Sequence, residues 1–370
     1  MALDFAPRNQ RACMNVLILG AGASYATHRL PVASNALSQW EQAIRHNCRL
    51  LAYALDMWLG TAWRETDLEA AWNRIDAAWK ERAAGALPAV PDLNTSQRRS
   101  MWKIAFEVAA AEPQDPNYYR SQLEWARNQG YSAEQFLAVA AGWELRRLIQ
   151  QTFVVPVKTD RRSPYDRLLR ELHPSTVISF NYDTLLEQCL DRAAWSYSAF
   201  SRGSSRITVL KPHGSVSWTH RLPIIHQSAE QVHLDVTLAP EALGYRGGWL
   251  EQNLVIGLRE KIEHTPHERS PVILTLFRDI LGACETALAS ATEVWIVGYR
   301  FAPADTSYLE VLTRSLTART EPPSLRVISH GDPDDLLPRI RDLFGFSVEN
   351  RIPHCFCGFE IWADHGFCSE

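Results

Sequence analysis

Two short apolar runs in this sequence end in side chains that could do chemistry. Residues 177–180 lead into Asn181-Tyr182-Asp183, and residues 207–210 lead into Lys211-Pro212-His213-Gly214-Ser215. An amide, a carboxylate and an imidazole brought together could orient a substrate, order a water molecule and accept a proton. An imidazole has an unperturbed pKa near ~6.5, which suits it to general-base work at neutral pH.

A third apolar run, residues 16–19, ends in Gly20-Ala21-Gly22-Ala23-Ser24. The glycines permit a tight turn and close approach of backbone to a phosphate, and the following helix would offer free N–H groups to a pyrophosphate. The dinucleotide fingerprint needs a third glycine where this chain has Tyr25, and Glu41, at the distance of a ribose-binding acid, falls inside an expected helix. The pattern favours a nucleotide site over an ordinary dehydrogenase, with a purely structural turn as the alternative.

These runs must be buried strands whose ends meet. Short β-rich runs alternate with helical patterns, which predicts an α/β fold with a Rossmann-like parallel sheet and helices on both faces. In such sheets ligands bind at the carboxyl ends of the strands. Besides 15–19, strands are expected at 176–180, 207–211, 253–257, 293–298 and 325–329, and helices at 164–172, 184–193, 271–290, 305–319 and 333–344.

Residues 35–164 interrupt this alternation and predict a large all-α insertion after the first strand and turn. Eight of the 13 tryptophans fall in this stretch. They are interpreted either as the core of a helical bundle or as a subunit or partner interface, where exposed Trp is favoured. The stretch has no catalytic motif of its own, so it is the expected place for oligomerisation or for docking of a regulatory partner.

The amino-acid composition limits the classes of protein to which this chain could belong. Of the 370 residues 46% are apolar and 22% are charged, and the formal net charge is -4. This balance argues against the sequence-independent nucleic-acid binding that a strongly basic surface would give. The 7 cysteines are scattered, the N-terminal stretch does not read as a signal peptide, and no apolar run is long enough to span a membrane. We therefore expect a reduced, cytoplasmic protein.

Taken in order, the motifs at 20–24, 181–183, 213–214 and 297–301 resemble those of the sirtuin superfamily. The chain looks most like the bacterial sirtuin-like branch whose members hydrolyse NAD in antiphage defence. The resemblance leaves the helical stretch and the C-terminus outside.

This resemblance implies a domain organisation. A discontinuous sirtuin-like Rossmann-type NAD-binding domain would occupy 1–34 and 165–350. The helical insertion would occupy 35–164, and a C-terminal edge hairpin or tail would occupy 351–370.

The resemblance also implies a role for each motif residue. Asn181 would order a water and a ribose hydroxyl and His213 would act as general base, so these two are the expected catalytic residues. The glycine turn would hold the phosphates, Asp183 would lie near the carboxamide, and the residues from Gly298 onward would lie near the adenosine half. The residues expected to bind NAD are Gly20, Ala21, Gly22, Ala23, Ser24, Pro31, Asp183, Gly214, Gly298, Tyr299 and Ser329.

Two departures set the chain apart from protein-deacetylating sirtuins. Those enzymes carry two Cys-x-x-Cys pairs for a structural zinc between the His-Gly motif and the later glycine strand, where this chain has only Cys284. After the glycine turn the chain keeps Pro31 of the usual Gly-Ile-Pro-Asp-Phe-Arg segment but lacks the Phe and Arg that help to manage nicotinamide. An acetyl-lysine groove is therefore not assumed, and water is the expected acceptor of the ADP-ribosyl group.

The leading hypothesis is an NAD glycohydrolase that releases nicotinamide and ADP-ribose, with NAD as its substrate. Its activity would be gated by homo-oligomerisation or by an associated ATPase or nucleotide-sensing partner. The alternatives are an NAD-dependent protein deacylase or ADP-ribosyltransferase, and a non-catalytic module that senses NAD or ADP-ribose. No direct contact with nucleic acid or with a membrane is expected.

Several of these residues also have purely structural interpretations. Asn181 and Asp183 could cap the helix that begins near Thr184, and His213 could be a turn residue. Asp305 is interpreted as a helix N-cap in preference to a ligand contact.

The C-terminal tail gathers residue types that bind metals. Its Cys-x-Cys pair also suits a half-buried edge hairpin, so no metal is assigned. The residues concerned are His354, Cys355, Cys357, His365 and Cys368.

Overall fold

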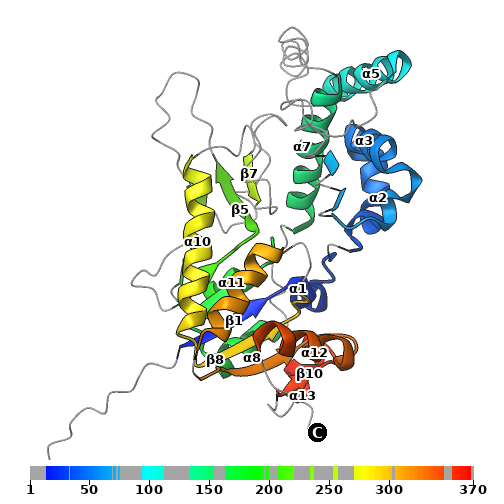
Figure 1. The fold of residues 1–370 in the computed structure, drawn as a ribbon. Helices are drawn as coiled ribbons and strands as arrows, with labels where there is room; N and C mark the ends of the chain where they lie inside the picture. The colour runs from blue at the N-terminus through cyan, green and yellow to red at the C-terminus, as the bar shows by residue number, and fades with distance from the viewer. Residues whose placement is uncertain are drawn as a thin grey trace, which may run out of the picture.

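The computed structural model describes residues 14–32, 34–68, 70–71, 74–75, 94–111, 133–153, 163–195, 197–199, 207–220, 234–236, 253–256, 271–301, 305–319, 321–345 and 352–367. Its centre is a 7-stranded sheet in the order β10-β9-β8-β1-β2-β4-β3, and every pairing in it is parallel (Figure 1). The strands are β1 (Asn15–Leu19), β2 (Thr176–Ser179), β3 (Tyr197–Ala199), β4 (Ile207–Leu210), β8 (Glu293–Val297), β9 (Ser324–Ile328) and β10 (His354–Cys355).

Helices cover both faces of this sheet, because successive side chains of a strand point to opposite faces. In β1, Val16 and Ile18 belong to one hydrophobic cluster, and Leu17 and Leu19 belong to the other. The Val16 face is covered by α10 (Pro271–Ala289), α11 (Thr306–Thr317) and α12 (Pro333–Phe344). The Leu17 face is covered by α1 (Ala21–His28), α8 (Pro164–Leu172), α9 (Leu185–Arg192) and α13 (Phe359–His365). The Rossmann-like fold predicted from the sequence is confirmed.

The strand order reverses beside β1. The chain runs from β1 outward through β2 and β4, and then returns past β1 to β8 and β9. The turn after β1 therefore lies between the ends of β2 and β8, at the switch point where ligands bind in sheets of this kind. Local signals fix the neighbouring helices: Ser163 caps α8 in a capping box with Asp166, and Asp332 caps α12.

The predicted all-α insertion lies between α1 and α8. It contains α2 (Ala36–Asn47), α3 (Arg49–Leu59), the 3-10 helix η1 (Gly60–Glu65), α5 (Thr95–Ala111) and α7 (Ala133–Phe153). Its apolar residues join the cluster on the Leu17 face of the sheet, so the helices and that face share one continuous core. The buried carboxylate of Glu144 on α7 accepts the N–H of Leu51 in the first turn of α3, at 2.7 Å.

The tryptophans of this block support the core interpretation where the structure describes them. Trp40, Trp58 and Trp63 are all buried, and Trp102 is half-buried against the hydrophobic cluster to which they belong. The side chains of Trp72, Trp79, Trp125 and Trp143 lie outside the described residues.

One strand predicted for the parallel sheet lies elsewhere. The run 253–257 forms β7 (Asn253–Ile256) in a separate 3-stranded antiparallel sheet, with β5 (Gly214–His220) between it and β6 (Leu234–Val236). Gly214 has a φ of 75°, which turns the chain out of the main sheet directly after β4. The prediction was wrong because a short apolar run looks the same in either kind of sheet.

In residues 352–367, the described part of the C-terminal segment, the chain forms an edge strand and a helix where an edge hairpin or tail was expected. β10 pairs in parallel with β9 at the sheet edge, and Gly358, at φ 107°, turns the chain into α13. Cys355 is buried and Cys357 is exposed because the strand ends between them. α13 is anchored by Arg167, whose Nη1 donates to the carbonyl oxygens of Trp362 and Ala363 at 3.0 and 2.7 Å, near the helix C-terminus.

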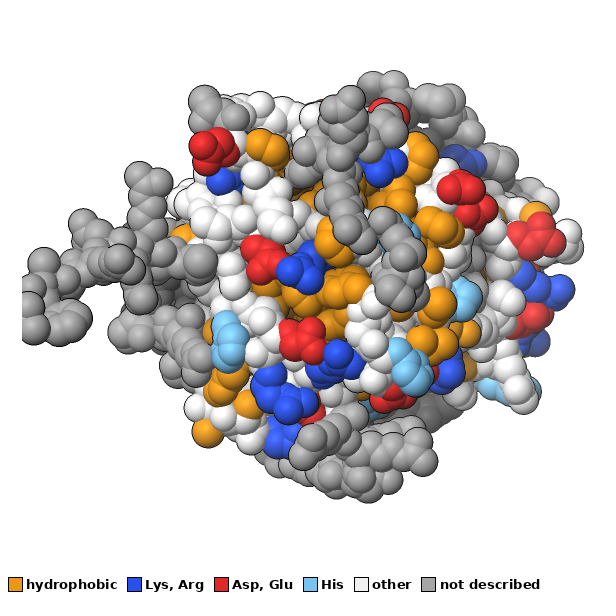
Figure 2. Space-filling view, turned by 90° about the horizontal axis from the view of Figure 1, so that it is seen from below, with side chains coloured by type: hydrophobic (Ala, Val, Ile, Leu, Met, Phe, Trp, Pro, Cys, Tyr) orange, Lys and Arg blue, Asp and Glu red, His pale blue; other side chains and the backbone are white. Residues whose placement is uncertain are grey.

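The surface charge is mixed in sign. On the face shown in Figure 2, acidic and basic side chains are interspersed with apolar ones. None of the helices in the described part of the chain is both long and apolar enough to cross a membrane.

Candidate active site

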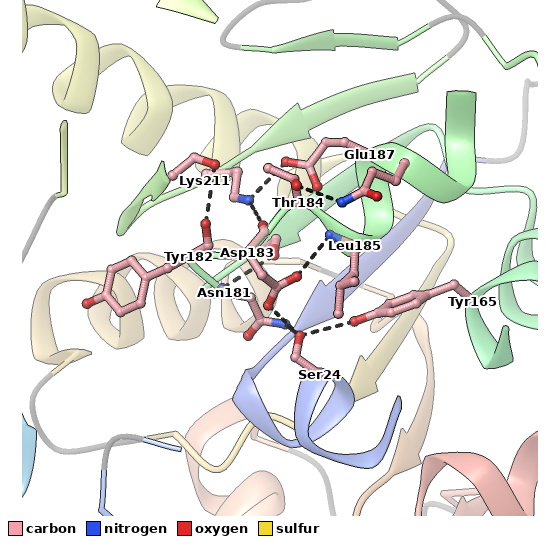
Figure 3. Close-up of polar contacts among 12 residues, drawn as sticks. Ser24, Tyr165, Asn181, Tyr182, Asp183, Thr184, Leu185, Glu187 and Lys211 are labelled. Atoms are coloured by element: carbon pink, nitrogen blue, oxygen red, sulfur yellow. Dashed lines mark hydrogen bonds and ion pairs between the residues drawn. The ribbon is translucent and has the colours of Figure 1, made fainter. Parts of the chain in front are cut away.

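Three polar side chains, one from the first turn of α1 and two from the loop after β2, form one hydrogen-bonded group (Figure 3). The hydroxyl of Ser24 donates to Oδ2 of Asp183 at 2.6 Å, and Nδ2 of Asn181 donates to the same hydroxyl at 2.9 Å. All three residues are buried, with 2%, 3% and 5% of their surfaces exposed. The structure thus joins residues 157 to 159 positions apart in the chain.

Asn181 keeps one hydrogen-bonding atom unused. Its Oδ1 is buried and accepts no hydrogen bond within the described structure. A buried amide oxygen without a donor costs free energy, so native proteins usually satisfy such groups. A ligand hydroxyl or a water molecule at this point would satisfy it.

Asp183 performs the capping role that the sequence allowed, and the side chain of Asn181 does not. Oδ1 of Asp183 accepts the N–H of Leu185 at 3.0 Å, in the first turn of α9. Its other oxygen remains for Ser24. Asp183 therefore ties the start of α9 to the turn after β1.

Behind this loop lies a buried ion pair. Nζ of Lys211, after β4, is 2.9 Å from Oε1 of Glu187 on α9 and donates to the backbone carbonyl of Asp183. The Lys211 and Glu187 side chains are only 1% and 6% exposed. Breaking such a pair leaves an uncompensated buried charge, so it rigidly fixes the loop that carries Asn181.

Tyr165 of α8 also contacts this hydrogen-bonded group. Its hydroxyl lies 3.4 Å from that of Ser24, and its ring packs on Phe359 of α13 at 5.3 Å between centroids. Complete burial, reinforced by the charge of Asp183, holds the pKa of Tyr165 well above its usual value. It therefore stays a neutral hydroxyl beside Ser24 at neutral pH.

The glycine turn packs closely against the end of β8. A Cβ on Gly20 would lie 2.5 Å from the oxygen of Gly298, and one on Gly298 would lie 2.2 Å from the nitrogen of Ala23. The N–H groups of Gly20 and Gly22 donate to the carbonyls of Val297 and Gly298 at 2.9 and 3.0 Å. The glycines therefore serve backbone-to-backbone packing at the switch point, and two of the turn's N–H groups are used there.

His213 belongs to a second group, which it forms with residues after β8. Nε2 of His213 lies 2.7 Å from Oδ1 of Asp305, and the Tyr299 hydroxyl donates to Oδ2 of Asp305 at 2.7 Å. His213, Asp305 and Tyr299 are 6%, 2% and 5% exposed. The N-cap position expected for Asp305 on α11 is confirmed, but its side chain makes no capping bond and reaches the imidazole instead.

Aromatic rings connect the two groups. The His213 ring lies 5.2 Å from Phe180 and 5.9 Å from Tyr182, the residues on either side of Asn181. In Figure 3 the Tyr182 ring points away from Ser24. The expected catalytic pair thus sits on neighbouring strand ends but in separate hydrogen-bonded groups.

The other expected residues lie along the same sheet edge. Gly214 completes a turn with its N–H on the carbonyl of Lys211 at 2.9 Å, and Ser329 follows β9 with its N–H on the carbonyl of Cys355 at 2.9 Å. Pro31 is buried beyond the end of α1. Among the described contacts, none joins the side chain of Pro31 or Ser329 to the two groups.

Sequence reasoning missed the residues that support the site. No role is predicted for Lys211 in the motif at 211–215, although a lysine directly after a fully apolar run needs a buried partner. Glu187, one helical turn after Asp183, could have been read as that partner. Tyr165 gave no signal, because its partners lie far away in the sequence.

In the described part of the chain no group of three or more His, Cys, Asp or Glu is arranged to hold a metal ion. In the tail, Nδ1 of His354 lies 2.9 Å from the carbonyl oxygen of Ile352, and Cys355 approaches that of Gly358. Cys368 lies outside the described residues.

Comparison with known proteins identifies the same region. A family model described as a SIR2-like domain matches residues 175–343, which include both catalytic candidates and Asp305. A solved structure of Sir2 bound to an inhibitor, 2'-O-acetyl-ADP-ribose and a deacetylated p53 peptide is 12% identical, covers 90% of this chain and 95% of its own, and has a TM-score of 0.32. No curated protein matches the chain. The match to a SIR2-like domain over residues 175–343 agrees, at the level of the superfamily, with the resemblance read from the motifs.

Proposed function

We propose that this protein is an NAD glycohydrolase, which cleaves the bond between nicotinamide and ribose to give nicotinamide and ADP-ribose. A SIR2-like domain implies NAD-dependent chemistry of the sirtuin kind. We further propose that the enzyme is a gated effector of bacterial antiphage defence, in line with the branch that its motifs resemble.

One observation carries the proposal: the unpartnered Oδ1 of buried Asn181 at the switch point of the sheet. The Nδ2 of the same amide is held by Ser24, so the amide cannot rotate without losing that bond. A fixed acceptor at this edge suits a ribose hydroxyl or the water that attacks the sugar. The residues present therefore fit the substrate.

The chemistry needs one acceptor of protons and one orienting group. Bound NAD supplies an electrophilic anomeric carbon and a nicotinamide leaving group, and cleavage develops oxocarbenium-like charge at the sugar. Asn181 would orient the water, whose oxygen forms the new bond to the anomeric carbon. The electron pair of the broken carbon–nitrogen bond stays on nicotinamide, and His213 takes the proton that the water loses and passes it to solvent.

Water is favoured over an acyl-lysine as acceptor. Cys284, the one cysteine between Gly214 and Gly298, is buried in α10, and burial raises the pKa of its thiol. A four-thiolate zinc site cannot be built from it. This departure from the protein-deacetylating sirtuins supports water, and not an acyl-lysine, as the acceptor.

The helical block is the proposed place of gating, by self-association or by a partner with ATPase or nucleotide-sensing activity. An unregulated NAD hydrolase would drain its host, so activity needs control. Phe153, the last residue of α7, lies 6.1 Å from the Trp40 ring of α2 and 5.9 Å from the Tyr182 ring. This contact joins the block directly to the loop that carries Asn181.

The test is release of nicotinamide from NAD, followed by chromatography, for the protein over a range of concentrations and for any assembly in which it copurifies. Asn181→Ala and His213→Ala should abolish turnover while the protein still binds NAD. His365→Ala, at an exposed position on α13 outside the helical block, is the control and should leave turnover unchanged.

Other outcomes discriminate the remaining functions. Nicotinamide release that depends on an acyl-lysine peptide or a protein acceptor would show a deacylase or transferase. Binding of NAD with no turnover in any assembly would show a sensing module and would contradict the proposal. Full activity of the Asn181→Ala, His213→Ala double variant would exclude this site.

A further inference from the structure

A buried carboxylate holds the imidazole of His213. Asp305 sits at the start of α11, on the far side of β1 from β4, which carries His213. Its Oδ1 lies 2.7 Å from Nε2 of His213, and its Oδ2 accepts the Tyr299 hydroxyl at 2.7 Å. Both carboxylate oxygens are thus engaged by groups from the strand ends, although the residue is 92 positions from His213 in the chain.

This geometry sets the tautomer of the imidazole. A carboxylate accepts hydrogen bonds, so the nitrogen that faces it carries the proton. A proton on Nε2 leaves Nδ1 as the basic nitrogen of neutral His213. A carboxylate at one ring nitrogen also stabilises the imidazolium that forms when the other nitrogen takes a proton.

The surroundings keep this arrangement rigid. Phe180 stacks on Tyr299 at 4.3 Å and 7°, and its edge-to-face contact with His213 is 5.2 Å. The Tyr308 hydroxyl donates to the carbonyl oxygen of Pro212 at 3.0 Å, which fixes the residue before His213. Rotation of the imidazole would break the carboxylate contact and displace packed rings.

The purely structural interpretation of Asp305 is that it only caps α11. Its side chain makes no capping hydrogen bond among the described residues, so capping does not explain where the carboxylate points. A nearly fully buried carboxylate is costly unless it is paired, and His213 and Tyr299 supply the pairing. The group is therefore built around the imidazole.

The structure assigns Asp305 as the positioning residue of His213, with Tyr299 holding the second oxygen of Asp305. This inference rests on the proposed function, because it gives His213 the proton-accepting role there. Tyr299, expected to bind NAD, then acts through its hydroxyl on Asp305. Within the part of the chain that the structure describes, the titratable groups that face the imidazole include Asp305, Tyr299, Tyr182 and Tyr308.

The kinetic test compares Asp305→Asn with Tyr308→Phe. Asn is an equally good N-cap residue, so α11 is retained. Asp305→Asn should lower kcat for nicotinamide release about 100-fold, within the range of ~10²–10⁴ for general-base catalysis, with little change in KM for NAD. The acid limb of its pH–rate profile should move to lower pH, because the carboxylate no longer stabilises the imidazolium.

Tyr308→Phe is the matched control, because it removes one buried hydroxyl from the same aromatic group without touching Asp305. It should lower the melting temperature and leave the pH profile in place. Tyr299→Phe should give a smaller loss of kcat than Asp305→Asn, in the same direction. An unchanged pH profile in Asp305→Asn, or an equal shift in Tyr308→Phe, overturns the inference.

A second measurement does not depend on turnover. Long-range ¹H–¹⁵N spectra of histidine-labelled protein, with His213→Gln to assign the signal, report which ring nitrogen carries the proton. The wild type should show the Nε2–H form, and Asp305→Asn should lose that preference. If the wild type releases no nicotinamide, the hydrolase proposal fails while these spectra still decide the role of Asp305. A dominant Nδ1–H form in the wild type, or identical spectra in both proteins, overturns it.

Discussion

The hydroxyl of Ser24 donates a 2.6 Å hydrogen bond to Oδ2 of Asp183, so the first turn of α1 and the loop after β2 are one hydrogen-bonded unit. A serine hydroxyl can donate only one hydrogen bond, and here the acceptor of that bond is Asp183. The side chain predicted to contact phosphate therefore organises its neighbours in this structure. Any phosphate contact of this turn would have to come from its backbone.

Ser24→Ala removes the shared partner of Asn181 and Asp183. We expect the free energy of unfolding to fall by about 1–3 kcal/mol, because two buried groups each lose a hydrogen bond. Nicotinamide release should fall further than the stability loss explains, because the Asn181 amide is then free to rotate. Ser290→Ala removes an exposed hydroxyl directly after α10 that donates to the carbonyl oxygen of Thr286, and it is the control for denaturant unfolding and turnover. Equal turnover in both variants would contradict the positioning role of Ser24.

Gly298→Ala should disrupt the switch point. The residue has a φ of 63°, and its Cβ would lie 2.2 Å from the Ala23 nitrogen, so strain and overlap add. We expect a loss of about 2–5 kcal/mol in the free energy of unfolding. Gly345→Ala has a similar φ of 66° but its nearest neighbour is 3.5 Å away, so it measures the strain alone. Thermal unfolding of both variants checks this: similar melting temperatures would show that the close packing is unimportant.

Phe153→Leu should uncouple the helical block from the site loop. The substitution keeps an apolar side chain but shortens the reach from α7 to Tyr182, now 5.9 Å between ring centroids. The ratio of turnover in the gated assembly to turnover of the free protein should change at least ~5-fold, which corresponds to about 1 kcal/mol of coupling. Phe344→Leu, buried in α12 in the other core cluster, is the control for lost packing. The same change of ratio in both variants would place the gate elsewhere.

Asp56→Asn should make the free energy of unfolding vary less with pH in the acid range. Burial would raise the pKa of Asp56, but hydrogen bonds from Arg45 at 2.6 Å and Trp63 at 2.8 Å outweigh it, so the pKa lies below its ordinary value. A depressed carboxyl pKa stabilises the fold above the unfolded-state value of about 3.9, and this contribution is lost as the pH falls through the folded-state pKa.

Urea unfolding between about pH 3 and 7 measures this effect. The gap between wild type and Asp56→Asn should be constant above about pH 5 and should close at the acid end. Asp364→Asn, at an exposed position of α13, controls for the change of charge. A gap that widens toward acid pH would mean that Arg45 and Trp63 do not hold the ionised carboxylate.

Much of the fold could be predicted because its signals are local. Strands such as 293–297 are apolar runs with sharp ends, and helices such as 164–172 carry their own caps. The assignment of 253–256 to the wrong sheet shows the limit of that reasoning. A strand's partner depends on where distant segments lie, and a four-residue run does not encode it.

The sequence by itself determined that Asn181, Asp183 and His213 end neighbouring strands and that a glycine turn lies beside them. Only the tertiary structure decided what these side chains do to one another. In the folded chain the Ser24 hydroxyl donates a hydrogen bond to Asp183, and Lys211 forms a buried ion pair with Glu187. The imidazole of His213 contacts the carboxylate of Asp305. Strand ends follow from local hydrophobic pattern, but buried polar groups take whichever partner the packing brings within about 3 Å. Those partners come from elements up to 159 residues apart.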